Sequence, residues 1–208
     1  AERKDNMSKK KVAGIVICAF IALGAIGNLM NPNDSSKPSG TTKQEQKQDA
    51  KHAPKQDNQE MQAYQKFVSI PMESDYDTVK NTFGVDGKMQ HENDIGGFKT
   101  QAYEFKVGKT TAIMTFQNGA LTSKAMDSLS FYKQNGEKIT LDEFNKIQTG
   151  MTYDQVKDLF KRDGLLKSET AIAGSGTKLY SWMNSDGSNA VITFGDGTVN
   201  SKTQTGLK

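Results

Sequence analysis

The sequence predicts an α+β protein made of two similar tandem units that follow a membrane-spanning segment and a linker. Three observations predict this arrangement: an apolar run near the start, a polar stretch without large apolar residues, and an internal repeat in the rest of the chain. The chain has 208 residues, of which 35% are hydrophobic and 25% charged. So low an apolar fraction indicates that part of the chain lies outside any packed core.

The apolar run covers residues 12–30 and contains no charged side chain. As a helix it would be roughly 28 Å long, close to the hydrocarbon thickness of a bilayer. Residues 1–11 form a basic head, which places the N-terminus in the cytoplasm and the remaining chain outside. We therefore predict a single-pass anchor. Two alternatives stay open: a signal peptide cut after Gly27, which would give a secreted protein, and a lipoprotein signal ending at Cys18.

The polar stretch covers residues 31–60 and has no Ile, Leu, Val, Met or aromatic residue. Such a segment buries too little apolar surface to offset its ordering entropy, so we predict a disordered linker. Residues 61–208 carry 17 basic and 17 acidic side chains. A neutral folded part lacks the positive charge that nucleic-acid binding needs, so we expect no nucleic-acid partner.

The rest of the chain repeats with a shift of 77 residues, which gives 14 identities over residues 64–105. The clearest match superimposes Tyr76-Asp77-x-Val79-Lys80-x-x-Phe83 on Tyr153-Asp154-x-Val156-Lys157-x-x-Phe160. A periodicity of this kind indicates two copies of one structural unit. We place the units at residues 61–131 and 139–208.

Each unit is expected to form two short helices followed by an antiparallel β-meander. Thr140-x-x-Glu143 and Thr152-x-x-Gln155 have the form of capping boxes, and Asp163-Gly164 is expected to end the second helix. Runs of alternating polarity predict strands, separated by turns at Gly108, Asn118-Gly119, Asp186-Gly187 and Asp196-Gly197. These strands are 101–107, 111–117, 179–183, 190–194 and one from 198 onward. Helices packed on one face of such a sheet form an α+β layer.

Side-chain alternation assigns the two faces of the sheet. Tyr103, Phe105, Tyr180 and Trp182 are expected in the core under the helices, with the apolar side chains of the neighbouring strands. The opposite face is left uncovered and is moderately apolar, which suits a partner surface. The candidate partner-binding residues on and beside it are Glu104, Lys106, Lys109, Ile113, Thr115, Leu179, Ser181, Met183, Val191, Thr193, Thr203 and Thr205.

Motifs for catalysis, cofactors and metals are weak, so we expect a non-enzyme with no cofactor and no metal. Gly108-Lys109-Thr110 lacks the earlier glycine of a phosphate loop, and residues 174–178 are better explained as a flexible loop. His91-Glu92-x-Asp94 has no second cluster to complete a zinc site. Asn184-x-Asp186-Gly187-x-Asn189 lacks the bidentate glutamate of a calcium loop. No nucleophile–base pair is present either.

Three segments carry a family resemblance: Phe144-x-x-Ile147-x-x-Gly150-Met151-Thr152-Tyr153-x-x-Val156, Thr193-Phe194-x-Asp196-Gly197 and Lys202-x-Gln204-x-x-Leu207. They resemble the tandem repeat of the β-lactamase inhibitory proteins and of uncharacterised bacterial envelope proteins that share it. The resemblance implies two units, each a helix-loop-helix on a four-stranded antiparallel sheet, with a joint concave face that grips a partner.

The resemblance also implies where this chain departs from the inhibitors, which grip with aromatic side chains. The aligned positions here are Thr110, Thr111, Ile113, Thr193, Thr203 and Thr205, and the acidic hairpin position aligns with Lys109. We therefore expect a membrane-anchored, extracytoplasmic module that binds a protein or envelope component. The alternatives are an inhibitor of a β-lactamase or penicillin-binding protein, an envelope assembly or stress factor, and an envelope enzyme.

Overall fold

The structure is a computed structural model that describes residues 54–127 and 137–208, all within one compact unit, Asp49–Lys208. The predicted head, apolar run and most of the linker lie outside the described residues, as do residues 128–131 of the first predicted unit. Within the described ranges, no helix is long and apolar enough to cross a membrane.

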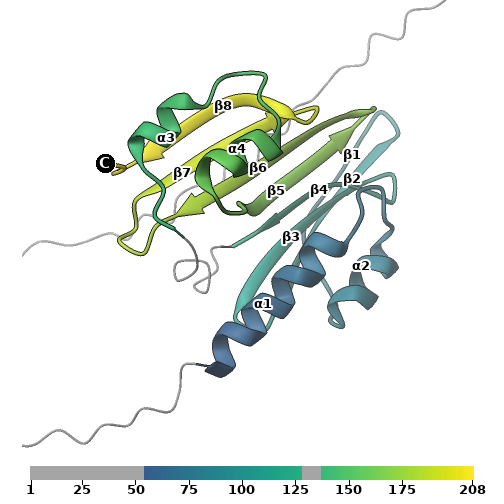
Figure 1. Cartoon of the computed structure of the whole chain (residues 1–208). Coiled ribbons are helices and arrows are strands. Elements are labelled where there is room, and N and C mark those ends of the chain that lie inside the picture. Colours follow the sequence, from purple (N-terminus) through teal and green to yellow (C-terminus); the bar gives the residue numbers. More distant parts are fainter. Residues whose placement is uncertain (1–53, 128–136) are drawn as a thin grey trace, which may run out of the picture. The chain divides into compact units, whose positions relative to one another are not determined.

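The described chain runs through two helices and four strands, and then through two more helices and four more strands. The first half (residues 54–127) contains α1 (Pro54–Ser69), α2 (Tyr76–Phe83), β1 (Lys88–Ile95), β2 (Phe98–Val107), β3 (Thr110–Gln117) and β4 (Ala120–Met126). The second half (residues 137–208) contains α3 (Leu141–Lys146), α4 (Tyr153–Phe160), β5 (Leu165–Ile172), β6 (Ser175–Met183), β7 (Asn189–Gly195) and β8 (Thr198–Thr205). The eight strands form one antiparallel sheet in sequence order (Figure 1), so the predicted α+β class is confirmed.

The helix caps follow the sequence, but two predicted boundaries are wrong. Thr140 and Thr152 both close the expected capping boxes, and Asp75 caps α2 by accepting a hydrogen bond from the Thr78 amide. Helix α4 ends at Phe160 with Lys161 in the left-handed conformation, before Asp163-Gly164. Helix α1 begins at Pro54, inside the segment predicted as a disordered linker. After its polar first turns, the helix places Met61, Ala63, Tyr64 and Phe67 in the core under the sheet.

The strands are longer than the alternating runs that predicted them. Residues 175–178 belong to β6, so the flexible loop expected there shrinks to a turn at Ala173-Gly174, where both φ angles are positive. Polar residues form this part of β6 because it pairs on both sides, with β5 and with β7. The turns at Asn118-Gly119 and Asp196-Gly197 lie where they were predicted.

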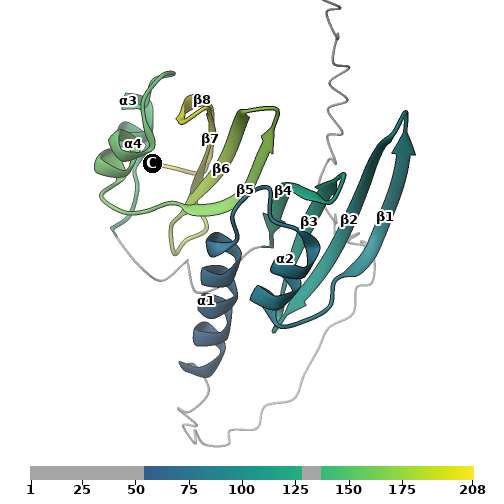
Figure 2. The same cartoon turned by 90° about the vertical axis from the view of Figure 1, so that its right-hand side faces the viewer.

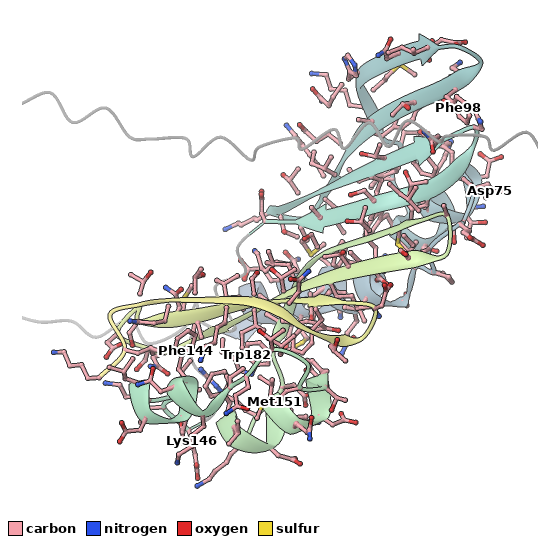
Figure 3. All side chains as sticks on the ribbon, turned by 90° about the horizontal axis from the view of Figure 1, so that it is seen from above. Asp75, Phe98, Phe144, Lys146, Met151 and Trp182 are labelled. Carbon is pink, nitrogen blue, oxygen red and sulfur yellow. The ribbon has the colours of Figure 1, made fainter. Side chains whose placement is uncertain are left out.

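The sheet carries two hydrophobic cores, and the rings of Phe67, Phe83 and Phe105 in the first correspond to those of Phe144, Phe160 and Trp182 in the second. The first core also includes Leu165 and Leu166 of β5, so it extends into the second half. Phe105 and Trp182 are both fully buried, which confirms the predicted core face. Each ring lies against a glycine, because a Cβ on Gly87 would meet the Phe105 ring at 2.6 Å and a Cβ on Gly164 would meet Trp182 at 2.6 Å. The Tyr76 and Tyr153 hydroxyls accept hydrogen bonds from these same two glycine amides. Figure 3 shows Trp182 and Phe144 between the strands and helices α3 and α4.

The two halves join where β4 pairs with β5, through Ser123 with Thr170, Lys124 with Glu169, and Ala125 with Ser168. This is the shortest pairing in the sheet. The register continues across it, because Met114, Lys124, Glu169, Lys178 and Phe194 lie opposite one another in turn. Both cores therefore lie on one face of the sheet, the face that carries the helices (Figure 2).

Candidate functional site: the open face of the sheet

The candidate site is the sheet face opposite the helices, which we call the open face. One row of directly opposed residues crosses it from β1 to β8 without a break. The row consists of Lys88, Glu104, Ile113, Ala125, Ser168, Leu179, Thr193 and Ser201. Because opposed residues in a sheet lie on the same face, this row is one surface shared by both halves.

A second continuous row lies beside the first one. It consists of His91, Ala102, Thr115, Ser123, Thr170, Thr177, Gly195 and Thr198. From β3 to β8 the two rows contain no charged residue; they contain hydroxyls, small side chains, Ile113 and Leu179. Most of the side chains on β3 to β6 in these rows are half-buried. The centre of the open face therefore offers apolar contacts and hydroxyl hydrogen bonds, and no ion pairs.

The register brings most of the predicted binding residues together. Glu104, Ile113, Leu179 and Thr193 share the first row, and Thr115 lies in the second. Two shorter rows in the second half contain the rest of its candidates: Ser181 lies opposite Val191 and Val191 opposite Thr203, and Met183 and Thr205 flank Asn189. Ser181 is only 8% exposed, so it lies largely beneath the surface that a partner would meet.

The remaining candidates lie at the first-half rim. Lys106 is exposed on β2 and its ammonium lies 3.6 Å from the Glu104 carboxylate. Lys109 is exposed in the turn between β2 and β3. The Gln90 amide donates a hydrogen bond to Glu104 at 3.3 Å, so that carboxylate is already held by neighbours. Within the two rows, charged side chains thus occur only on β1 and β2.

One position aligned with the inhibitors' grip is wrong, since Thr110 does not lie on the open face. It pairs with Val107 and shares the helix-side face with Ala112, Met114 and Phe116, and it is 3% exposed. The alignment crosses the Gly108-Lys109 turn, where a slip of one residue moves a side chain to the other face. Thr111, its neighbour, is the residue that belongs to the open face.

Five further residues of this face were missed from the sequence. Ser123, Ala125, Ser168, Thr170 and Thr177 form its centre on β4, β5 and β6. They are small or polar, so hydrophobic alternation gave no signal for them. The internal repeat did contain a signal for Ser123. Ser123-Lys124 aligns with Ser201-Lys202, which places β4 and β8 in equivalent positions.

The two motifs considered for metals have other roles in the structure. His91, Glu92 and Asp94 lie along exposed strand β1, and no cluster of three or more metal-ligating side chains occurs within the described ranges. Asn184 is buried, and its side chain bonds both the N–H and the carbonyl of Ile139. Asp186 lies 2.8 Å from the Lys138 ammonium and accepts hydrogen bonds from Ser188, and these contacts together hold the pKa of Asp186 well below its usual range.

Comparison with known proteins gives the family. Residues 63–174, more than half of the 208-residue chain, match the family described as Beta-lactamase inhibitor (BLIP). The chain belongs to this family. A solved structure from Streptococcus mutans, described as a "putative beta-lactamase inhibitor protein", is similar with a TM-score of 0.60 and 14% identity. The similarity covers 71% of this chain and 98% of that one. No curated protein matches.

In this BLIP-family chain a buried lysine on the helix side of the sheet links the two halves that share the open face. The Lys124 ammonium is 1% exposed and lies 3.2 Å from the Glu169 carboxylate on the neighbouring half. It also donates to the Ile70 carbonyl at 2.6 Å and to the Phe67 carbonyl at 3.2 Å, at the end of α1. Burial lowers the Lys124 pKa, and Glu169 partly opposes this effect. A second link joins the halves where the Leu166 amide donates to the Tyr64 hydroxyl at 2.8 Å.

Proposed function

We propose that this BLIP-family chain is a non-catalytic protein-binding module that grips its partner with the open face. The observation that carries the proposal is the unbroken register of the two rows across all eight strands. A surface built jointly by both halves is wide enough to receive a protein partner, and the absence of charge at its centre removes the cost of desolvating ions on binding.

We further propose that the module works outside the cytoplasm, held to the membrane by residues 12–30. This part rests on the sequence alone: an uncharged run of bilayer length after a basic head. The partner would then be a protein or another component of the cell envelope. Release after signal cleavage is the alternative, and mass determination of the mature protein from membranes distinguishes the two.

The open-face proposal is tested by capture from the envelope fraction of the source cell. Leu179 is the large apolar residue that the second half contributes to the first row, so Leu179→Arg should abolish capture of the partner that the unchanged chain retains. The matched control is Asn81→Arg, which places the same charge on the exposed side of α2, away from the open face. Loss of capture by Asn81→Arg, or capture that survives Leu179→Arg, would refute the proposal.

Inhibition of a β-lactamase is the second candidate function, and family membership favours it. The side chains do not: the resemblance implies aromatic anchors, whereas the aligned open-face residues here are Thr111, Ile113, Thr193, Thr203 and Thr205. Anchors of that kind usually contribute most of the binding energy. Losing two or three of them, at roughly 2 kcal/mol each, weakens binding by about a thousandfold or more.

We therefore expect no nanomolar inhibition of a class A β-lactamase. The hairpin tip supports this, because Lys109 stands where the resemblance implies an acid, and a reversed charge in a desolvated contact costs several kcal/mol. The assay is hydrolysis of a chromogenic β-lactam with increasing amounts of the purified chain. Nanomolar inhibition would make the inhibitor function the leading one.

A further inference from the structure

The two outer strands of the sheet differ in how their free edges are treated. On β8, the Val199 amide donates to the Met151 carbonyl at 2.7 Å and the Gly150 amide donates to the Val199 carbonyl at 2.9 Å. A bridge between Thr152 and Thr198 adds to this cover. On β1, no segment within residues 54–127 or 137–208 hydrogen-bonds to the outer edge. All eight residues of β1 are exposed.

Apolar side chains gather beside this open edge. Of the six large hydrophobic residues that the described chain exposes, four lie on or next to β1: Val85, Met89, Ile95 and Phe98. Phe98 is 59% exposed and Ile95 55%, and the two lie opposite each other at the tip of the β1–β2 hairpin. Figure 3 shows Phe98 at this far end of the sheet. An unpaired strand edge with apolar side chains is a template for pairing with another strand.

A second copy of this chain does not fit the edge. A β-bulge between Met89 and His91 leaves only His91–Ile95 as a regular strand. Antiparallel pairing of two copies about Asn93 would set Glu92 of each copy opposite Asp94 of the other. Like charges directly opposed in a sheet are destabilising, so pairing of two copies of β1 in this register is disfavoured.

The same side chains suit a basic strand with alternating polarity. Glu92 and Asp94 lie on the helix-side face, opposite Gln101 and Lys99, while His91, Asn93 and Ile95 lie on the open-face side. Glu92 is paired with Lys99 at 3.2 Å. Asp94 makes no ion pair with any described residue. We propose that β1 accepts an extended segment of another protein as a ninth strand. That segment carries lysine or arginine opposite Glu92 and Asp94, and apolar side chains beside Ile95 and Phe98.

The probe is a fluorescent, capped heptapeptide of alternating lysine and valine, titrated by anisotropy against the full chain in a mild non-ionic detergent. Three peptides serve as controls: one with glutamate in place of lysine, one with the same composition in two blocks, and one with N-methylated amides on alternate residues. A photoreactive version of the probe, followed by mass spectrometry, locates the site. The expected cross-links fall within residues 88–98.

Binding should require the lysines, the alternation and the free amides together. Asp94→Lys should weaken it roughly three- to tenfold, the range that one exposed charge contact and its reversal produce. The control Asp158→Lys makes the same charge change on exposed α4 and should have no effect. Both sites are exposed, so both variants should fold, which circular dichroism verifies. Equal binding of the N-methylated or glutamate peptide, cross-links outside the hairpin, or no binding at about 1 mM would overturn the proposal.

Discussion

Lys124 on β4 and Lys202 on β8 occupy equivalent positions in the two halves, and each ammonium binds the end of a helix. Lys202 donates to the Phe144 carbonyl at 2.7 Å and lies 4.5 Å from the centre of the Phe144 ring. Lys124 does the same to the Phe67 carbonyl and lies 5.2 Å from that ring. Their surroundings differ because β4 has a neighbouring strand beyond it, whereas β8 is the outer strand.

This difference shows what joining two units into one sheet requires. At the join Lys124 is taken out of water, and Glu169 on β5 supplies the compensating charge. Glu169 also lies 3.3 Å from the Lys178 ammonium, so a short charged row crosses the join on the helix-side face. At the outer strand Lys202 remains partly exposed, and burial lowers its pKa without an acidic partner. The two halves thus share the lysine and its contact with a helix end, as the repeat predicts. The surroundings of the two lysines differ because one lies at the join between the halves and the other on an outer strand.

The largest expected effect comes from the matched core rings. Trp182→Ala should lower the free energy of unfolding by roughly 3–5 kcal/mol, as deletion of a large buried aromatic does. Phe105→Ala should cost less, since Trp182 is larger and its indole N–H also donates to the Arg162 carbonyl at 3.1 Å. Urea unfolding followed by circular dichroism measures both. An unchanged stability for Trp182→Ala would mean that the assignment of the two faces is reversed.

The core residues show how much of the fold could be predicted from the sequence. The repeat and its alternation predicted the buried rings, the capping residues and the hairpin turns, because each depends on contacts a few residues apart or on the period of a strand. The pairing of β4 with β5 joins segments more than 40 residues apart, and Ser123, Thr170 and Ser168 carry no apolar signal. The face on which Thr110 lies depends on the residue at which β3 begins. An alignment that crosses the Gly108-Lys109 turn does not determine that residue.

The second prediction separates the two lysines. Lys124→Met should destabilise the protein by about 2–4 kcal/mol, because it leaves the Phe67 and Ile70 carbonyls and the Glu169 carboxylate without a buried partner. Lys202→Met should cost about 1 kcal/mol or less, since water can replace a lysine that is partly exposed. Denaturant unfolding of both variants gives the comparison. Equal losses of unfolding free energy in the two variants would show that the position of Lys124 at the join adds nothing to its contribution to stability.

The double variant Lys124→Met with Glu169→Met sharpens this prediction. Replacing a buried ion pair by apolar side chains is often close to neutral, so the double variant should be more stable than the sum of the two single losses indicates. Strict additivity would mean that Lys124 acts through the α1 carbonyls alone and that the ion pair across the join contributes little.

The smallest expected effect concerns the turns that end β3 and β7, where the two halves use different side chains for one geometry. Asn118 has φ 49° and Asp196 has φ 47°. The Asn118 side-chain oxygen accepts from the Lys99 amide at 2.9 Å, and the Asp196 carboxylate accepts from the Gly176 amide at 2.8 Å. Each backbone amide donates in return to the carbonyl of the same partner, at 2.8 Å in both halves. Only an acceptor oxygen is used, and both residue types tolerate this left-handed conformation.

Asn118→Asp should therefore change the free energy of unfolding by less than about 0.5 kcal/mol, as exposed substitutions that keep their contacts do. Asn118→Ala removes the acceptor and places a Cβ-bearing residue without a compensating bond at positive φ, so it should cost about 1–2 kcal/mol. Denaturant midpoints of the two variants, with Asp196→Asn as the reciprocal test, measure the difference. If Asn118→Asp were as damaging as Asn118→Ala, the amide N–H₂ of Asn118 would have to make a contact that Asp196 lacks, and the two turns would not be equivalent.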